Sequence, residues 1–437
     1  MTTINIRRLR RDARSIAGLL AVAVVSATFI ACNSINDALH VTAPDKIDAK
    51  SLQDPAFATL LVNSTVGNFE CGYGAFVAVG GLLSDELVDV GITASRWPYD
   101  RRDVQTSDGA YSTNTCDNTT PGVYTPISTA RYTADTVSAL LKSWTDQQVP
   151  GRQDLLAKAL IYAGYDRIML GELFCSAAID RGPELTSLEV LAQAEQKFSD
   201  GLTAAQAAND PTLTALAYMG RARARLDQGN LTGADVDAKQ VPPGFVYNAT
   251  ADIASSVRTN RVYAQFNSKL ASVTPQFIGL TVPTASGGTV PDTRIADSTT
   301  GKNGADNHTP LIVSNKYRAG DAPIRIGSYE EAQLIIAEAE GGQVAVNIIN
   351  KLRIAAGLPG AFQSTDATAI KNQVIDERSR ELFLQGTRAY DIRRLNLPQV
   401  PAAGVAYLHG GTYGTEMCLP LPDVERNNNP NINKTGA

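Results

Sequence analysis

The amino-acid sequence predicts a mainly α protein: a partial α-solenoid of helix hairpins, with long loop-rich insertions and a few short strands. Apolar residues recur at helical spacing through several long stretches, which is the primary sequence mark of helices. Small residues surround the Gly229-Asn230 and Gly341-Gly342 turns, so that paired helices can approach closely. The stretches between these pairs are polar and rich in Gly, Pro and Asn, which is typical of loops.

Length and composition describe an ordinary folded body. The 437 residues suffice for one large domain or for two to three smaller ones, and 43% of them are hydrophobic and 19% charged. The net charge is −5, whereas proteins that bind nucleic acid or lie on anionic lipid surfaces are typically rich in positive charge. We therefore expect no nucleic-acid partner.

The N-terminus has the pattern of an export signal. An arginine-rich segment precedes an uncharged apolar run, 16–31, which is shorter than the roughly 20 residues of a comfortable membrane span. The run ends at Ala31-Cys32, which resembles a bacterial lipobox, although Phe29 stands where an aliphatic residue is usual. We predict a signal peptide over residues 1–31 and an anchor of palmitate-type acyl chains on Cys32. The alternative is a plain secretory signal with an incidental cysteine, and the protein is exported in either case.

Four further cysteines remain, an even number in an oxidising compartment, and three connectivities are possible. We favour Cys71–Cys116, which closes an N-terminal loop, and Cys175–Cys418, which ties an early helix to the C-terminal segment. The alternative is four free buried thiols.

The first half of the chain is predominantly helical. Thr186 and Glu189 have capping-box spacing and predict the start of one helix. The interval 89–126 is polar and irregular but holds several aromatic residues, and a long loop of this kind is more often functional than idle. The stretches with helical periodicity are 55–87, 126–144, 153–174 and 188–208.

Two later stretches, 213–239 and 329–356, each predict a helix hairpin. Each has small residues along its first helix and a glycine-containing turn before the second helix. This pattern resembles a tetratricopeptide-type hairpin.

The stretch between these hairpins, 241–328, has a different pattern. Residues 241–247 and 262–266 suggest short strands, and the Gly-, Asp- and Asn-rich run 285–309 predicts a loop. Four side chains of this part could together hold a calcium ion, but their spacing matches no calcium-binding loop, so that a solvated loop without metal is favoured: Asp297, Asn303, Asp306 and Asn307.

These patterns predict a single domain over 56–437, after a lipid-anchored tether over 32–55. Its parts are N-terminal helices and hairpins at 56–240, a loop-rich insertion at 241–328, and C-terminal helices with a charged segment at 329–437, of which residues 398–437 are loop-like.

The charged segment runs from Glu377 to Arg394 and reads ERSRELFLQGTRAYDIRR. Its first half has opposite charges at helical i,i+3 spacing, and Gly386 then breaks the pattern. A salt-bridged structural junction is favoured over an ionic active site, because charge runs usually face solvent or each other. The residues that carry the pattern are Glu377, Arg378, Glu381, Gly386, Arg388, Asp391 and Arg393.

The same segment resembles the C-terminal signature of the SusD/RagB family of outer-membrane nutrient-uptake lipoproteins. Other pieces resemble the family in the same order: Leu83-Ser84-Asp85-Glu86, the helix from Tyr329, the turn at Gly357-Leu358-Pro359, and Cys418-Leu419-Pro420-Leu421-Pro422. The resemblance covers most of 32–432.

This resemblance implies a function as well as a fold. It implies a scaffold of tetratricopeptide-like hairpins whose loop-rich face captures an oligosaccharide or another nutrient. The protein would sit, lipid-anchored and facing outward in the outer membrane, on a SusC-like TonB-dependent transporter and pass the ligand inward. It also implies that the charged signature supports the fold rather than the ligand.

A sugar-binding site needs aromatic rings for stacking and a few hydrogen-bonding groups. The loop 89–126 offers these groups, and we predict that they contact the ligand: Trp97, Tyr99, Asp100, Arg101, Tyr111 and Tyr124. The alternative is that these side chains pack inside the protein or face the transporter. Whether the ligand is a glycan or a peptide stays open at this point.

The sequence does not predict an enzyme or a cofactor. His40, His308 and His409 lie in unrelated contexts, and no zinc-protease, nucleophile-elbow or phosphate-loop motif is present. Asp85 and Glu86 are neighbours on a predicted helix and point in different directions, whereas a glycosidase needs two facing carboxylates. A third possibility is a helical-repeat lipoprotein that scaffolds envelope assembly.

Overall fold

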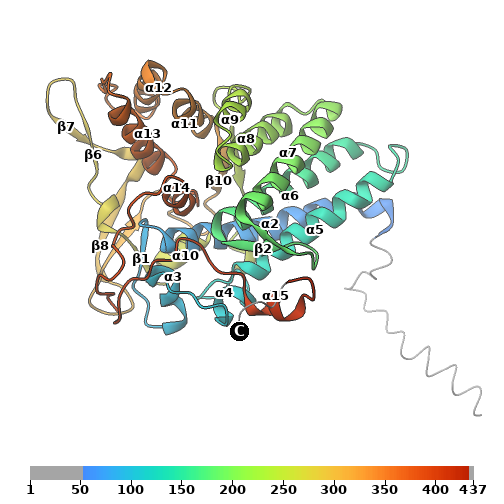
Figure 1. The fold of residues 1–437 in the computed structure, drawn as a ribbon, viewed down its shortest axis with the longest axis horizontal. Coiled ribbons are helices and arrows are strands. Elements are labelled where there is room, and N and C mark those ends of the chain that lie inside the picture. The colour runs from blue at the N-terminus through green and yellow to red at the C-terminus, as the bar shows by residue number, and fades with distance from the viewer. Residues whose placement is uncertain (1–52, 433–437) are drawn as a thin grey trace, which may run out of the picture. The chain divides into compact units, whose positions relative to one another are not determined.

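A computed structural model of the chain describes residues 53–432. The chain from Pro55 onward forms one compact unit, shown in Figure 1. The predicted signal peptide (1–31), the lipid anchor on Cys32 and nearly all of the tether lie outside the described residues.

Helix α2 (Ala58–Leu83) lies at the centre of the N-terminal part. It is apolar around most of its circumference, which is typical of a helix buried on all sides. Of the described residues, Pro55–Leu83 alone has the length and hydropathy of a membrane span, and 78% of its most apolar window is buried inside the protein, as for a core helix. It packs against α5 (Tyr124–Ser143) and α6 (Arg152–Leu173).

The helices that follow stack side by side, each against the next, as Figure 1 shows. Thr186 and Glu189 form the predicted capping box at the start of α7. Gly229, at a φ of 78°, makes the turn between the two helices of the predicted hairpin. These helices are α7 (Ser187–Ala208), α8 (Pro211–Asp227) and α9 (Leu231–Ala238).

The C-terminal helices extend this stack. Helix α11 packs on α9 and α12, and apolar side chains of α8, α9, α11, α12 and α13 share one core cluster. The mainly α, hairpin-based fold is therefore confirmed. The helices are α11 (Tyr329–Glu340), α12 (Gly342–Ala355), α13 (Ala367–Glu381) and α14 (Arg388–Arg394).

The strands of the described chain form two-stranded antiparallel sheets: β1 (Leu87–Asp89) with β5 (Ala271–Val273), β2 (Ser176–Ala178) with β3 (Glu184–Thr186), β4 (Val246–Ala249) with β10 (Ile324–Ser328), β6 (Thr281–Pro283) with β7 (Thr289–Pro291), and β8 (Asp297–Asn303) with β9 (Pro310–Ser314). Short helices complete the loops: α3 (Trp97–Arg101), α4 (Gly109–Thr113), α10 (Arg261–Asn267), α15 (Asp423–Asn428), and 3₁₀ turns at Pro55–Phe57, Ala94–Arg96, Ser256–Arg258, Pro275–Phe277 and Thr293–Ile295.

Two predictions for the insertion are wrong. Residues 262–266 are helical in α10 rather than a strand, because the Asn260 side chain caps the backbone N–H of Tyr263 and starts a helix there. The run 285–309 is not all loop, because β7 and β8 lie within it and pair with neighbouring strands. Pairing partners elsewhere in the chain supply the hydrogen bonds that local composition does not predict.

Two disulfides close the chain in the connectivity favoured above. Cys71 on α2 is bonded to Cys116, with Cα atoms 5.6 Å apart. Cys175, just after α6, is bonded to Cys418, with Cα atoms 5.1 Å apart. The second bond joins segments 243 residues apart and fixes the C-terminal loops against the helix stack.

Candidate functional site

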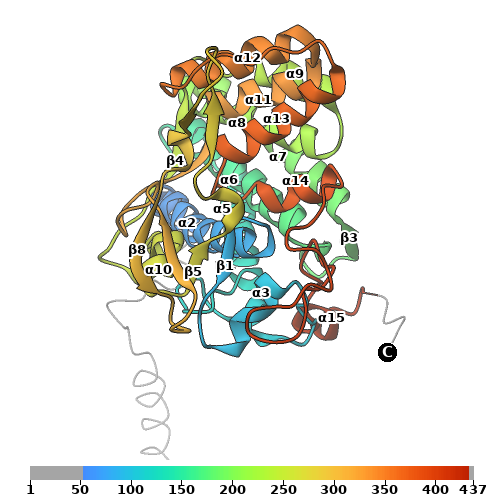
Figure 2. The same ribbon diagram turned by 90° about the vertical axis from the view of Figure 1, so that its left-hand side faces the viewer.

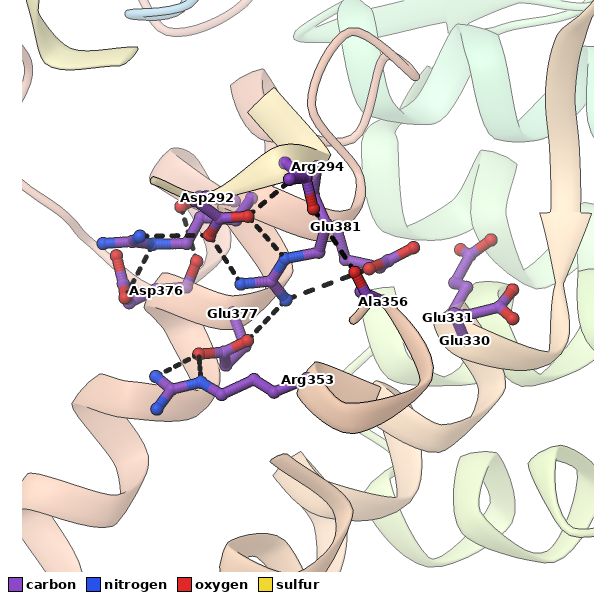
Figure 3. Close-up of polar contacts among 12 residues, drawn as sticks. Asp292, Arg294, Glu330, Glu331, Arg353, Ala356, Asp376, Glu377 and Glu381 are labelled. Atoms are coloured by element: carbon purple, nitrogen blue, oxygen red, sulfur yellow. Dashed lines mark hydrogen bonds and ion pairs between the residues drawn. The ribbon is translucent and has the colours of Figure 1, made fainter. Parts of the chain in front are cut away.

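The charged segment Glu377–Arg394 lies in the interior, and its partners come from distant elements. Glu377 is fully buried and accepts hydrogen bonds from Arg353 at 2.8 and 2.5 Å and from Arg294 at 2.6 Å. Figure 3 shows the Arg294 guanidinium between Asp292 and Glu377, with Arg353 reaching Glu377 from α12.

The predicted i,i+3 ion pairs of this segment are wrong. Arg378 pairs with Asp391 of α14 at 3.1 Å rather than with Glu381, and Arg380 pairs with Asp376 and Asp292 rather than with Glu377. Arg378 thus reaches a partner on another helix, whereas Arg380 pairs at i,i+4 spacing along α13 at 2.9 Å and across to Asp292 at 3.2 Å.

The second half of the segment contacts the rest of the core in the same way. Arg388 makes a bidentate pair with Asp85 at 2.7 and 2.6 Å, and Arg394 makes one with Glu338. Arg393 donates to the backbone oxygens of Gly171 and Phe174 at the end of α6. These contacts hold α14 against α6, α11 and the segment that follows α2.

Paired arginines hold the Asp391 carboxylate of this cluster in its charged form. Although burial opposes ionisation, Arg378 and Arg394 lower the pKa of Asp391 to about 2. Gly386, at a φ of 86°, packs its Cα where a Cβ would collide with the Phe76 ring, so that only glycine fits there. The charged side chains of this segment are already paired with other protein groups, which supports a structural role for the segment.

Asp85 and Glu86 belong to this structural cluster and not to a catalytic pair. Glu86 accepts the backbone N–H of Leu384 at 2.8 Å, while Asp85 holds Arg388. Burial raises the pKa of Glu86 to about 8. The N-terminal and C-terminal motifs that resemble the family therefore contact each other directly.

Four of the six predicted ligand contacts are buried instead. Tyr99, Asp100, Tyr111 and Tyr124 are each at most 4% exposed. The Tyr99 hydroxyl donates to the backbone oxygen of Pro121 at 2.7 Å, and the Tyr124 hydroxyl donates to Glu425 at 2.9 Å. These rings of the loop 89–126 thus form a small internal core, with Tyr99 on α3, Tyr111 on α4 and Tyr124 at the start of α5.

Asp100 lies in this small core as well. One of its oxygens accepts the backbone N–H of Asp89 at 2.8 Å, and burial raises its pKa to about 8. A carboxyl group buried in this way fixes the loop and does not face a ligand.

Trp97 and Arg101 are the predicted contacts that remain partly exposed. The Trp97 ring stacks on His409, with ring centroids 4.6 Å apart, and its indole N–H donates to the Gly91 oxygen at 2.9 Å. Arg101 pairs with Asp103 at 2.7 Å and lies over the Tyr407 ring. One face of the Trp97 ring is therefore already covered.

A groove of about 400 Å³ lies between α10 and the β8–β9 hairpin, and we call it the α10 groove. This volume is within the usual range of small-ligand sites. Its residues come from α10, from both strands of the hairpin and from the segment after β9: Tyr263, Phe266, Asn267, Lys269, Thr300, Lys302, Leu311, Val313, Ser314, Asn315, Tyr317 and Arg318.

The α10 groove combines an apolar floor with polar walls. Phe266, Leu311 and Tyr317 are buried beneath it, and the Tyr317 hydroxyl is occupied by the Leu384 oxygen at 2.9 Å. The half-buried Tyr263 ring and the exposed Asn267 stand at its side. This is the arrangement that stacks a ring and hydrogen-bonds its substituents.

Backbone contacts place the α10 groove beside the loop that carries Trp97. Val90 donates to the Leu270 oxygen at 3.0 Å, and its own oxygen accepts the N–H of Asp306 at 3.0 Å. Figure 2 shows α3, β1, β5, α10 and β8 together on one side, away from α9, α11 and α12.

Sequence reasoning missed the α10 groove. Its residues are spread over 263–318, in a stretch predicted to be strand and loop, and no periodic pattern links them. The dipeptide Tyr317-Arg318, an aromatic ring next to a cation in the segment after β9, was the available sign.

A larger cavity of about 750 Å³ lies among α8, α9, α11, α13 and α14. Aliphatic side chains such as Leu226, Ile370 and Val374 line much of it, and its charged residues Glu338 and Arg394 pair with each other. Two further polar residues of this cavity are also paired, Glu340 with Lys239 and Gln228 with Glu195.

Among residues 53–432 no group of three or more His, Cys, Asp or Glu side chains could hold a metal ion. In the loop with the oxygen-bearing residues, the Asp306 carboxylate accepts from the backbone of His308 and Thr309, and Asn303 donates to the Asn307 oxygen. These contacts close the loop on itself.

Comparisons with known proteins agree with this architecture. Residues 314–435 match the model of the SusD family. A SusD superfamily protein from Bacteroides vulgatus ATCC 8482 superposes with a TM-score of 0.64 at 15% identity, over 87% of this chain and 98% of that one. The resemblance to the SusD family is confirmed.

Two further SusD-like structures show the same fold. A SusD-like carbohydrate binding protein from Bacteroides vulgatus ATCC 8482 has a TM-score of 0.64 at 14% identity, over 87% of this chain and 98% of that one. A laminarin binding SusD-like protein has a TM-score of 0.58 at 15% identity, over 86% and 98%. No curated protein matches the sequence.

Proposed function

We propose that the protein captures an oligosaccharide in the α10 groove, at the outer face of the outer membrane, and passes it to a SusC-like TonB-dependent transporter. The observation that carries the proposal is the composition of the groove. An apolar floor, a half-buried tyrosine ring and polar walls that carry amide and hydroxyl groups meet in one cavity.

The chemistry of sugars explains why these groups suit them. A pyranose ring has an apolar C–H face that stacks on an aromatic ring, and its hydroxyls need hydrogen-bonding partners around the edge. Tyr263 offers the ring, and its hydroxyl donates to the Asn267 side-chain oxygen at 3.4 Å, so that the Asn267 amide N–H groups remain to donate to a sugar hydroxyl. Two solved structures with this fold are named as carbohydrate-binding or laminarin-binding, which supports a glycan over a peptide.

The proposed location and partner rest on the sequence. The export pattern ending at Ala31-Cys32 supports a lipid anchor in the outer membrane, and the SusD family match supports a TonB-dependent transporter as partner. Co-purification of the full chain with the transporter of the same genomic locus would test this part. Isolation with an envelope-assembly machine instead would favour a scaffold.

We propose binding without catalysis. The residues that line the α10 groove include no Asp or Glu, so that the groove lacks the two facing carboxylates of a glycosidase. Incubation of the purified protein with bound oligosaccharides should return them uncleaved.

The proposal is tested by removing the stacking ring. Tyr263→Ala should weaken oligosaccharide binding about tenfold or more, as measured by affinity electrophoresis and titration calorimetry against a panel of neutral and acidic glycans. Tyr132→Ala is the matched control, because Tyr132 is a 60% exposed ring on α5, in another cavity. Loss of binding with Tyr132→Ala alone would move the site to that cavity, and no binding to any glycan would overturn the proposal.

Trp97 remains a proposed second contact at the edge of this region. Trp97→Ala should weaken binding of longer oligosaccharides more than binding of short ones, because Trp97 lies beyond the segment 90–91 that borders the groove. Equal weakening for all lengths would place Trp97 inside the primary site.

A further inference from the structure

We infer that the α10 groove selects anionic oligosaccharides, whose sugars carry carboxylate or sulfate groups, over neutral ones. This inference rests on the proposed function and adds the chemical class of the ligand. Three cationic side chains at the rim of the groove carry it: Lys269, Lys302 and Arg318.

The three cations converge from three separate segments. Lys269 follows α10, Lys302 lies near the end of β8, and Arg318 follows β9. All three residues are exposed. Their side chains have no ion-pair or hydrogen-bond partner among residues 53–432, and no carboxylate lines the groove. The rim therefore presents uncompensated positive charge.

The charged cavity next to the groove shows the contrast. It has a volume of about 220 Å³, shares Asn315 with the α10 groove, and is lined by Arg294, Lys316 and Arg325. There Glu381 lines the same cavity and pairs with Arg325 at 3.3 Å. That cavity holds its own counter-charge, whereas the α10 groove lacks one.

Main-chain contacts fix two of the rim positions. The backbone oxygen of Lys269 accepts the N–H of Ala305 at 2.9 Å, which ties the residue after α10 to the tip of the β8–β9 hairpin. Lys302 lies in that hairpin, and its backbone N–H donates to the Thr300 hydroxyl at 3.2 Å. The distance between these two backbone positions is therefore set by the fold and not by a ligand.

The rim chemistry matches acidic sugars. An arginine fork can bind a carboxylate or a sulfate through two hydrogen bonds, and lysines act as mobile point charges. The floor of Phe266, Leu311 and Tyr317 and the ring of Tyr263 accommodate the sugar ring itself. A groove with uncompensated cations around an apolar floor favours an anionic ring over a free anion, which would not use the floor.

Binding assays on the lipid-free chain test the inference. The probes are a tetramer of galacturonic acid, its carboxyl-reduced neutral counterpart, a sulfated galactan oligosaccharide and its desulfated counterpart, with a polyglutamate peptide as the non-sugar anion. We expect the acidic probes to bind at least tenfold more tightly than their neutral counterparts at low salt. This preference should shrink as salt rises, because exposed charges are screened.

Variants locate the preference. Lys269→Glu, Lys302→Glu and Arg318→Glu should each weaken acidic-probe binding by about fivefold, and the triple variant should abolish the preference for acidic probes. Lys371→Glu on α13 is the matched control, because Lys371 is an exposed lysine that lines a different cavity and undergoes the same charge change. Circular dichroism and thermal melting confirm that each variant is folded.

The outcomes separate the two proposals. Preference for the uronate or the sulfated probe, lost in the triple variant and kept in Lys371→Glu, supports the inference and shows which anionic group is read. Equal binding of acidic and neutral glycans, or an unchanged preference in the triple variant, overturns the inference and leaves glycan capture standing. Binding of polyglutamate alone, or of no probe and no glycan in the panel, overturns both.

Discussion

The Glu377–Arg394 segment and the rim of the α10 groove carry similar cations in opposite situations. In the segment, Arg378, Arg388 and Arg394 are largely buried and each meets a carboxylate within 3.1 Å. At the rim, Lys269, Lys302 and Arg318 are exposed and meet none among the described residues. The first set stabilises the chain, and the second set is free to bind something else.

This difference shows how to interpret charge in such a protein. A buried cation with a carboxylate partner has already lost its water and gained its counter-charge, so that it has little left to offer a ligand. An exposed cation without a partner keeps its charge available. Dense charge in the sequence therefore marked the structural region, and sparse charge marked the proposed site.

The largest expected effect is in the buried cluster. Glu377→Ala should lower the free energy of unfolding by about 3–5 kcal/mol, because Arg353 and Arg294 would remain buried without this partner. Denaturant unfolding measures it. Glu184→Ala, which removes an exposed pair with Arg426, is the control and should change the same quantity by less than about 1 kcal/mol. Similar small losses for both would mean that the cluster does not stabilise the fold.

Arg388→Ala should have the next largest effect. It would leave the buried Asp85 carboxylate without its bidentate partner and lower the free energy of unfolding by about 2–3 kcal/mol. The ratio of acidic to neutral glycan affinity should stay unchanged at temperatures where the variant is folded. A changed ratio with normal unfolding would assign the segment to the ligand instead.

A smaller effect concerns pH. Burial raises the pKa of Asp100 from 3.8 to about 8, so that the folded protein holds this proton more tightly than the unfolded chain does. The resulting stabilisation is complete below about pH 4 and is lost as the pH rises through about 8. Asp100→Asn removes this dependence. As the pH rises from 5 to 8, the free energy of unfolding of the variant should therefore increase relative to that of the native protein. Parallel pH profiles for the two proteins would contradict the buried, protonated carboxyl.

The smallest effect on stability belongs to the rim. Lys302→Glu should change the free energy of unfolding by no more than about 0.5 kcal/mol, because no side-chain partner is lost. Its effect on acidic-glycan binding should nevertheless exceed that of Arg388→Ala. A large loss of stability in Lys302→Glu would show that the rim, like the segment, is structural, and would erase the contrast between the two regions.

Local patterns predicted the helices well and the insertion poorly. The capping box at Thr186 and Glu189 and the turn at Gly229 depend on neighbours in sequence, and both stand as predicted. Strands β7 and β8 depend on pairing with β6 and β9, so that the composition of 285–309 could not reveal them. Helix α10 was missed because its valine, tyrosine and phenylalanine favour strands. In the structure the Asn260 side chain caps the first turn and stabilises a helix instead.

The predicted ligand contacts illustrate the same limit. Aromatic residues in a polar loop are equally consistent with a binding surface and with a small internal core, and Tyr99, Tyr111 and Tyr124 belong to the core. Which side of a loop faces water is set by the elements that pack against it, and those come from distant parts of the chain.

The sequence by itself determined the helical hairpins, the family resemblance and the identity of the charged segment, because each depends on residues a few positions apart. Tertiary structure alone decided which charges are paired, since Glu377 meets Arg294 across 83 residues and Arg388 meets Asp85 across 303. It also decided the α10 groove, whose three cations lie close together only because a helix and a hairpin fold against each other. Pairing and burial are properties of distances in space, and those distances do not follow from local sequence.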